Sequence, residues 1–272
     1  MYLLYLVLLG YCIFSLLFYL GQDFFFFRPE RLPTNFKYRY SFPFEELHFD
    51  MEDGGYINGI YFRVPNAKGV VFYFKGNSKS IKGWGKFARD FVGKGYDFFM
   101  IDYRGFGKSK GKRSEASLYS DGQHVYKWLS KRYNEENIIV YGRSLGSGLA
   151  TRIASWNDPK MLILDSPYLS FYHLVKRYAF LLPLKWILKY QFRTDLFIKK
   201  VTCPIFILHG NKDKLIPYQH SLELVEIAGP NAHLLTIEGG KHNDLPTFAS
   251  YHDYLYDIMN QEGVYLTAMA KA

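Results

Sequence analysis

Residues 138–148 read IIVYGRSLGSG, and the fold can be predicted from this stretch. A run of β-branched and aromatic residues ends at Gly142, and small and apolar residues follow Ser144. This pattern predicts a buried strand that turns sharply into a helix with the serine at the apex. Gly142 and Gly146 lie two residues on either side of Ser144, where a larger side chain would collide with so tight a turn.

The same Gly-x-Ser-x-Gly spacing occurs a second time at residues 107–111, so the pattern alone is a weak signal. No apolar strand leads into Ser109 and no apolar helix leaves it, because the surrounding loop is basic and rich in glycine. We therefore expect Ser109 to lie in an ordinary loop. Ser144 is the candidate nucleophile, and the alternative for it is a tight turn without chemistry.

The composition fits one large α/β domain with a short appendage. The chain has 272 residues, of which 49% are hydrophobic, and the 24 Tyr and 24 Phe suit an acyl-binding or lipid-facing protein. The net charge of +9 is spread over short clusters, the densest at residues 108–113. We expect a solvated loop there, with contact to anionic lipid headgroups as the alternative. No nucleic-acid motif accompanies the charge.

The two cysteines predict neither a structural disulfide nor a metal site. Cys12 lies in the hydrophobic N-terminus and Cys203 opens a predicted core strand, so they are badly placed to pair. This usage fits a reducing compartment.

The N-terminus predicts a membrane helix. Residues 2–20 are almost continuously apolar and uncharged, about the length needed to cross a bilayer. No basic residue precedes them and no small-residue cleavage site follows, which favours a retained anchor over a cleaved signal. We expect a transmembrane or signal-anchor helix over 1–25 and a linker over 26–40. The basic residues after the helix favour a single-pass anchor with the rest of the chain in the cytoplasm, and a periplasmic or other extracytoplasmic location is the alternative.

Strands and helices alternate along most of the remaining chain, which predicts a mostly parallel central sheet with helices on both faces. We assign this domain to residues 41–262 and a tail to 263–272. It should open with an antiparallel hairpin. The hairpin strands are expected at 44–51 and 56–64, further strands at 69–74, 96–103, 137–141, 161–164, 204–208 and 232–237, and helices at 80–92, 118–133, 145–156 and 245–259.

One region breaks the alternation, because residues 166–201 contain no strand signal. Aromatic, amphipathic segments over 168–182 and 184–197 flank Pro183. An insertion here would lie above the carboxyl edge of the sheet, where Ser144 points. We predict a small helical cap over the site, with an ordinary crossover helix as the alternative.

A serine hydroxyl needs an adjacent base, and that base needs a carboxylate to orient it. His242 follows the predicted strand 232–237 and a glycine turn, so it lies in a loop beyond a strand end. Asp213 follows the strand 204–208 and reaches the same edge, and Asp165 is the alternative acid. His209 ends a core strand and is expected to be structural. The other downstream histidines should lie on helix or strand surfaces: His173, His220, His233 and His252.

The order Ser144, Asp213, His242 belongs to the α/β-hydrolases among the serine triads. A hydrolase of this kind also needs N–H donors for a developing oxyanion. The backbone N–H of Leu145, directly after the serine, should be one donor. The second should come from the loop after the strand 69–74, from Asn77 or Ser78.

Five ordered motifs resemble one family, the Bem46/ABHD13-type α/β-hydrolases, over about residues 29–260 and including the anchor. The motifs are KGNS at 75–78, DYRGFGKS at 102–109, GRSLG at 142–146, HGNKD at 209–213 and KHND at 241–244. The resemblance implies the α/β-hydrolase fold and its triad. It also implies that the Asp102 motif forms a fold-determining turn. The family usually has histidine where this chain has Lys75, a change that could alter loop packing or selectivity.

The family is similar to serine esterases, acyl-thioesterases and lysophospholipases, and many members are loosely described as serine peptidases. We therefore predict a membrane-anchored, monomeric serine hydrolase that cleaves carboxylic ester or thioester bonds of acyl or lipid-like substrates. It should need neither a metal nor an organic cofactor and should bind no nucleic acid. The alternatives are a serine peptidase with the same triad and a non-catalytic binding module.

Overall fold

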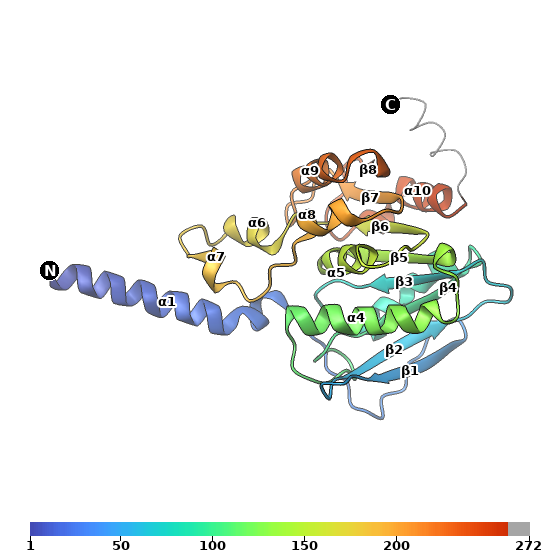
Figure 1. Ribbon diagram of the computed structural model, residues 1–272, viewed down its shortest axis with the longest axis horizontal. Coiled ribbons are helices and arrows are strands. Elements are labelled where there is room, and N and C mark those ends of the chain that lie inside the picture. The colour runs from blue at the N-terminus through green and yellow to red at the C-terminus, as the bar shows by residue number, and fades with distance from the viewer. Residues whose placement is uncertain (261–272) are drawn as a thin grey trace.

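Eight strands form one sheet in the order β1-β2-β4-β3-β5-β6-β7-β8 in this computed structural model, which describes residues 1–260 (Figure 1). The predicted tail and the last two residues of the predicted domain lie outside the described residues. The strands are β1 Phe44–Asp50, β2 Tyr56–Phe62, β3 Val70–Phe74, β4 Asp97–Ile101, β5 Ile138–Arg143, β6 Met161–Asp165, β7 Ile205–Gly210 and β8 Ala232–Ile237.

The sheet is mostly parallel, as predicted. Among the strands of residues 1–260, only the pairs β1–β2 and β2–β4 are antiparallel, so β2 alone runs against the other strands there. The predicted hairpin is confirmed as β1 and β2. Every residue of strands β3 to β7 is buried, which explains why these strands are continuous apolar runs instead of alternating ones.

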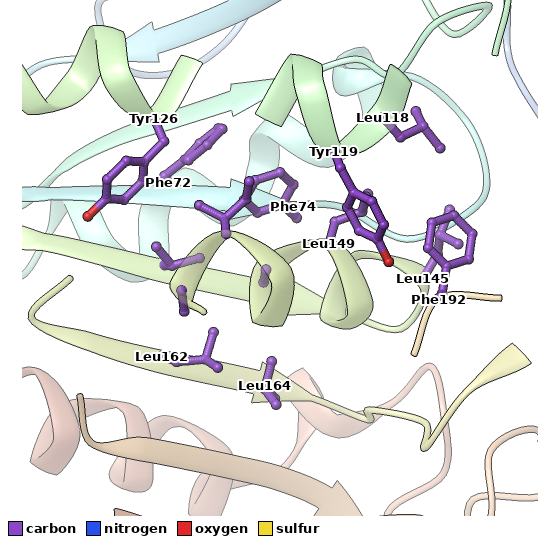
Figure 2. Packing of buried hydrophobic residues seen from close by; sticks show 14 of the residues in the cluster. Phe72, Phe74, Leu118, Tyr119, Tyr126, Leu145, Leu149, Leu162, Leu164 and Phe192 are labelled. Carbon is purple, nitrogen blue, oxygen red and sulfur yellow. The ribbon is translucent and has the colours of Figure 1, made fainter. Parts of the chain in front are cut away.

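Helices cover both faces of the sheet, because successive side chains of each strand point to opposite sides. Phe72 and Phe74 of β3 pack toward α4 and α5 (Figure 2), whereas Val71 and Tyr73 pack in the second core, with α3 and α10. The helices around the sheet are α2 Ile81–Trp84, α3 Arg89–Val92, α4 Glu115–Ser130, α5 Leu145–Ala154, α9 Gln219–Ala228 and α10 Ala249–Asn260, with 3-10 turns at Gly85–Ala88, Glu135–Asn137, Ile198–Lys200, Gly229–Asn231 and Leu245–Thr247.

The turn from β5 into α5 is as tight as the sequence predicts. Ser144 has φ 52° and ψ −119°, a conformation that a residue with a side chain rarely adopts. A Cβ atom on Gly142 would lie 2.5 Å from the Cβ of Ala150. A Cβ atom on Gly146 would lie 2.1 Å from the carbonyl oxygen of Phe74. Only glycine therefore lets the first turn of α5 lie directly against β3.

Residues 166–201 connect β6 to β7 and contain three short α-helices. They are α6 Phe171–Lys176, α7 Leu184–Ile187 and α8 Thr194–Phe197. The amphipathic segments over 168–182 and 184–197 are therefore only partly helical, and side chains from elsewhere satisfy backbone groups of this segment. The Gln22 amide bonds to the carbonyl of Ile187 and the N–H of Lys189, and the Glu115 carboxylate accepts from the N–H groups of Gln191 and Phe192.

Helix α1, Tyr2–Phe26, is long and apolar enough to cross a membrane by its length and composition. Figure 1 shows it extending from the body of the protein with its C-terminal half beside α6 and α7. Gln22 is fully buried there, and Phe18 packs against the cluster that includes Leu182 and Leu188. The end of α1 is therefore part of the folded body of the protein.

The predicted linker begins as an ordered segment that lies on the loops above the sheet. The N–H of Arg28 donates to the carbonyl of Asn77 at 2.8 Å, and the N–H of Leu32 donates to the carbonyl of Gly107 at 2.9 Å. Glu30 accepts from the Ser80 hydroxyl at 2.7 Å. Burial raises the pKa of Glu30, but hydrogen bonds from Ser80 and Lys82 and the Lys82 charge together lower it below its usual value.

The basic cluster at 108–113 is only partly solvated, which corrects the expectation of a solvated loop. Lys108 is buried and pairs with Glu46 at 2.7 Å. Arg113 pairs with Asp23 at 3.2 Å and lies over the ring of Phe27, 4.1 Å from its centre. These two cations therefore hold neighbouring segments together and are not free to bind an external partner.

The close contact between α5 and β3 predicts that Gly146→Ala will destabilise the fold by about 3 kcal/mol or more, since backbone must move to make room. Unfolding of the detergent-solubilised protein by urea measures this. Gly83→Ala is the matched control, because its added Cβ would meet only the Lys79 side chain at 3.6 Å. It should change stability by less than about 1 kcal/mol. Equal stabilities for the two variants would contradict the packing described for the turn.

Candidate active site

The structure brings together the three side chains singled out in the sequence. The Oγ atom of Ser144 lies 2.9 Å from Nε2 of His242, and Nδ1 of His242 lies 2.7 Å from Oδ2 of Asp213. A carboxylate can only accept, so Nδ1 carries the hydrogen and the lone pair of Nε2 faces the serine hydroxyl. Each residue comes from the carboxyl end of a strand: β5, β8 and β7 respectively.

Both carboxylate oxygens of Asp213 accept hydrogen bonds. Its Oδ1 atom accepts from the N–H groups of Leu215 and Ile216 at 2.8 and 2.9 Å. Burial raises the pKa of the Asp213 carboxyl, but hydrogen bonds from His209 and His242, with the attraction of His242, outweigh it and hold this pKa well below its usual value. Asp213 is therefore an ionised acceptor at neutral pH.

His209 is structural, as expected, and the structure shows what it holds. Its Nε2 atom lies 3.2 Å from Oδ2 of Asp213 and 3.1 Å from the carbonyl oxygen of Ile216. Both neighbours are acceptors, so Nε2 carries the hydrogen and Nδ1 accepts from the Ser221 hydroxyl at 2.6 Å. His209 therefore helps to orient Asp213 through the same oxygen that His242 contacts, a role that the sequence pattern did not reveal.

Asp165, the alternative acid, has different partners. It lies 3.5 Å from the Nε atom of Arg143 and accepts from the Tyr141 hydroxyl at 3.1 Å. The same arginine donates to the carbonyl of His242 at 3.4 Å and has the rings of Trp84 and Phe87 nearby. Asp165 and Arg143 therefore connect the turn at Ser144 to the loop that carries His242.

The loop after β3 lies beside the serine. A Cβ atom on Gly76 would be 3.8 Å from that of Ser144, so the backbone here approaches closely. The Asn77 side chain donates to the carbonyl of Phe26 at 3.1 Å, and this bond ties the loop to the end of α1. Leu145 starts α5, where a helix leaves its first N–H groups without partners inside the helix.

Lys75 is fully buried and takes the place of the histidine expected from the resemblance. Its Nζ atom lies 3.5 Å from Asp102 and 3.8 Å from the ring centre of Phe106, and donates to the carbonyl of Lys79 at 3.2 Å. Burial lowers the pKa of Lys75 and raises that of Asp102, and the attraction between them opposes both shifts. Asp102 also accepts from the N–H of Ile81 at 3.0 Å, so it holds the loop after β3 against the start of α2.

A cavity of about 490 Å³ opens onto Ser144. Residues of the segment between β6 and β7 form one side of it, and the end of α1 forms another. The sequence does not reveal the contribution of α1, because aromatic residues after an apolar helix are equally typical of a membrane interface. The lining residues are Phe25, Phe26, Arg28, Gly76, Asn77, Ser78, Trp84, Arg143, Ser144, Leu145, Tyr168, Phe171, Leu174, Val175, Tyr178, Leu215, Ile216, His242 and Asn243.

Ser109 and His220 are both buried. Ser109 is buried in its loop, where its hydroxyl donates to the carbonyl of Asp102 and accepts from the N–H of Asn58. These bonds join its hydroxyl to backbone groups and not to a base. His220, expected on a helix surface, is instead buried on α9, and burial lowers its pKa to about 4.

Neither cysteine forms a disulfide: Cys12 is exposed on α1 and Cys203 is buried. Within residues 1–260, no group of three or more His, Cys, Asp or Glu side chains is placed to hold a metal ion.

Known proteins are similar to this chain, some in sequence and some in fold. "Alpha/beta hydrolase domain-containing protein 17B" of Homo sapiens is 32% identical over 218 residues, which are 74% of this chain and 70% of that protein. The chain belongs to the α/β-hydrolase family. A second α/β-hydrolase relative, protein 17C of Xenopus laevis, is 30% identical over 235 residues, which are 80% of this chain and 70% of that protein. The family described as "Serine aminopeptidase, S33" matches residues 65–196.

Solved structures show the α/β-hydrolase fold directly. An esterase of Pyrococcus furiosus superposes with a TM-score of 0.69 at 22% identity, and the match covers 87% of this chain and 98% of the esterase. A cold-adapted esterase from an Arctic intertidal metagenomic library gives 0.59 at 18% identity, over 83% and 98% of the two chains. Family membership supports hydrolase activity. The Bem46/ABHD13 subtype that the sequence motifs resemble stays a prediction.

The low pKa of Asp213 predicts a pH-dependent contribution to stability. The folded pKa lies below the unfolded value of about 3.9, so ionised Asp213 stabilises the fold at neutral pH and this stabilisation is lost as the pH falls below about 4. Asp213→Asn should therefore cost about 2 kcal/mol at pH 7, since charged hydrogen bonds are lost. The difference in the free energy of unfolding between Asp213→Asn and the unchanged protein should shrink in strong acid. Urea unfolding at a series of pH values measures it, and a difference that is independent of pH would contradict the assignment.

Proposed function

We propose that this α/β-hydrolase is a membrane-anchored serine hydrolase that cleaves carboxylic ester or thioester bonds through an acyl-enzyme. The observation that carries the proposal is the continuous chain of contacts from Ser144 through His242 to Asp213, of which Ser144 and His242 line the cavity. The proposed catalytic residues are these three, and Leu145 and Asn77 supply the oxyanion N–H groups. The mechanism requires no metal or organic cofactor, and one copy of the chain contains every group that takes part.

In the first half of the reaction, the Ser144 hydroxyl gives its proton to Nε2 of His242 while Oγ forms a bond to the carbonyl carbon. Asp213 holds the imidazole in the required tautomer and stabilises its positive charge. The N–H groups of Leu145 and Asn77 bind the oxygen that becomes negative. His242 then gives the proton to the leaving alcohol or thiol, and the carbon–oxygen or carbon–sulfur bond breaks.

In the second half, a water molecule gives a proton to His242 and its oxygen attacks the acyl carbon. The proton returns to Oγ of Ser144 as the acid leaves. The strained backbone of Ser144 supports this cycle, because it keeps the hydroxyl at the edge of the sheet where base and oxyanion donors meet.

The cavity lining supports an acyl or lipid-like substrate. The lining side chains from the segment between β6 and β7 are all aromatic or aliphatic: Tyr168, Phe171, Leu174, Val175 and Tyr178. Phe25 and Phe26 add two more rings from α1. Such a surface binds an alkyl chain through the removal of apolar area from water.

A peptidase with the same triad is the second candidate, favoured by the description of the family that matches residues 65–196. An aminopeptidase needs an acidic group to hold the protonated N-terminus of its substrate. Within residues 1–260, the cavity lining contains no aspartate or glutamate, and it does contain Arg28 and Arg143. The lining therefore favours an acyl substrate over an N-terminal amine. A non-catalytic binding module is the third candidate, and the complete set of contacts at Ser144 argues against it.

Labelling by a fluorophosphonate probe tests the nucleophile. The folded protein should be labelled, and Ser144→Ala should lose the label together with at least about four orders of magnitude of hydrolysis rate. Ser109→Ala is the control with the same local sequence pattern and should keep the label. Labelling that persists without the Ser144 hydroxyl would refute the assignment.

A series of p-nitrophenyl esters of increasing acyl length tests the substrate class. If the aromatic wall binds the chain, kcat/KM should rise by up to roughly fourfold for each added methylene until the cavity is full. Aminoacyl p-nitroanilides should be cleaved far more slowly. Faster cleavage of the anilides than of every ester would establish the peptidase instead.

A further inference from the structure

A cluster of large apolar side chains is exposed in the middle of the segment between β6 and β7, which forms one side of the cavity. We call residues 176–187 the cap tip. Tyr178, Phe180, Leu181 and Trp186 are all exposed there, and Trp186 leaves 86% of its surface in contact with solvent. Single exposed apolar residues need no explanation, but four within nine positions form a patch of the kind that marks an interaction surface.

The cap tip lies beside α1. The Tyr11 hydroxyl donates to the carbonyl of Leu181 at 2.9 Å, and the Gln22 side chain donates to that of Ile187 at 2.7 Å. Phe18 packs between these two contacts, against a cluster that includes Leu182 and Leu184. Figure 1 shows α6 and α7 alongside the C-terminal half of α1.

These contacts fix how far the cap tip reaches along α1. Tyr11 and Gln22 are eleven residues apart, which is about 16 Å along a helix axis. The headgroup layer on each side of a bilayer is only about 5–8 Å thick. If the apolar part of α1 crosses a bilayer and Gln22 lies at the outer boundary of the headgroup layer, the cap tip therefore reaches through the headgroups and into the hydrocarbon.

The charges of this region fit an anionic lipid surface. Residues 166–193 contain five Lys or Arg and no Asp or Glu. Lys176, Arg177, Lys185 and Lys189 are exposed, close to the apolar side chains. Long basic side chains of this kind keep their charge among lipid phosphates while their stems lie against apolar groups.

The cavity adjoins the same surface. Tyr178 belongs both to the exposed patch and to the cavity lining, and Phe25 and Phe26 line the cavity from the end of α1. The apolar lining of the cavity therefore continues onto the face that the cap tip and α1 share.

We propose that the cap tip is a second membrane contact, which inserts beside α1 into an anionic phospholipid leaflet and joins the cavity to it. An acyl chain then passes from the leaflet to Ser144 without crossing water. This inference rests on the proposed membrane anchoring by α1 and on the proposed acyl substrate. It goes beyond them, because an anchor by itself leaves the orientation of the cavity undefined.

Fluorescence quenching of Trp186 tests the insertion without any need for hydrolysis. The full chain is incorporated into vesicles of phosphatidylcholine with a minority of phosphatidylserine and nitroxide-labelled lipid. The chain has four Trp, so the Trp186 signal is the difference between the unchanged protein and Trp186→Phe. We expect this difference signal to be strongly quenched by nitroxide near the headgroup end of the acyl chain. A difference signal that nitroxide lipid leaves unchanged would overturn the proposal.

Resistance of the vesicle-bound protein to alkaline extraction reports the anchoring by α1 separately. An extractable protein would refute the anchor, whereas an anchored protein with an unquenched Trp186 would refute only the cap tip contact. A second copy of the chain is the other occupant that could cover the patch. In that case the Trp186 signal would be insensitive to nitroxide lipid and would change on dilution in detergent, which would also overturn the proposal.

Hydrolysis measurements test the delivery of substrate. The triple change Phe180→Ser, Leu181→Ser and Trp186→Ser should lower the hydrolysis of an ester embedded in the same vesicles by roughly tenfold or more. Hydrolysis of soluble p-nitrophenyl butyrate should stay unchanged, since none of the three side chains lines the cavity. The matched control is Leu222→Ser with Tyr256→Ser, two exposed apolar side chains on α9 and α10. An equal loss on both substrates, or a loss on neither, would overturn the role in delivery.

Discussion

The close approach of α5 to β3 is the constraint on which the rest of the structure depends. The first turn of the helix lies so near the end of the strand that Gly146 has no room for a Cβ atom against the Phe74 carbonyl. This contact forces Ser144 into its positive-φ conformation, which costs about 1–3 kcal/mol. The N–H of Ser144 recovers a bond to the Asp165 carbonyl at 2.9 Å, and the buried face of α5 supplies the remaining stabilisation.

The carboxyl edge of the sheet is held together by buried polar groups that almost all have partners. Arg143 connects β6 to the loop after β8, and Asp213 collects donors from two histidines and two backbone N–H groups. Buried charges are costly unless they are paired and hydrogen-bonded. The same bonds that meet this requirement therefore also fix the distance between Ser144 and its histidine.

The sequence was informative wherever local chemistry decides the structure. The strands, the hairpin and the turn at Ser144 follow from apolar runs, β-branched residues and glycine spacing, all of which act between near neighbours. The positions of Asp213 and His242 follow because parallel strands bring their carboxyl ends to one edge. The short helices after β6 did not follow, because Gln22 and Glu115, distant in sequence, satisfy the backbone there. The burial of Lys108 and His220 likewise depends on segments that no local pattern identifies.

The contact between Asn77 and Phe26 has a consequence for how this protein can change during evolution. The residue proposed to bind the oxyanion is held by the backbone at the end of α1, and the same helix end supplies two rings to the cavity. A membrane anchor is usually free to diverge, because any apolar sequence of suitable length preserves its function. Here the last two turns of α1 are bound by the same constraints as the cavity wall. Residues 18–26 should therefore covary with the segment between β6 and β7, while residues 2–10 drift.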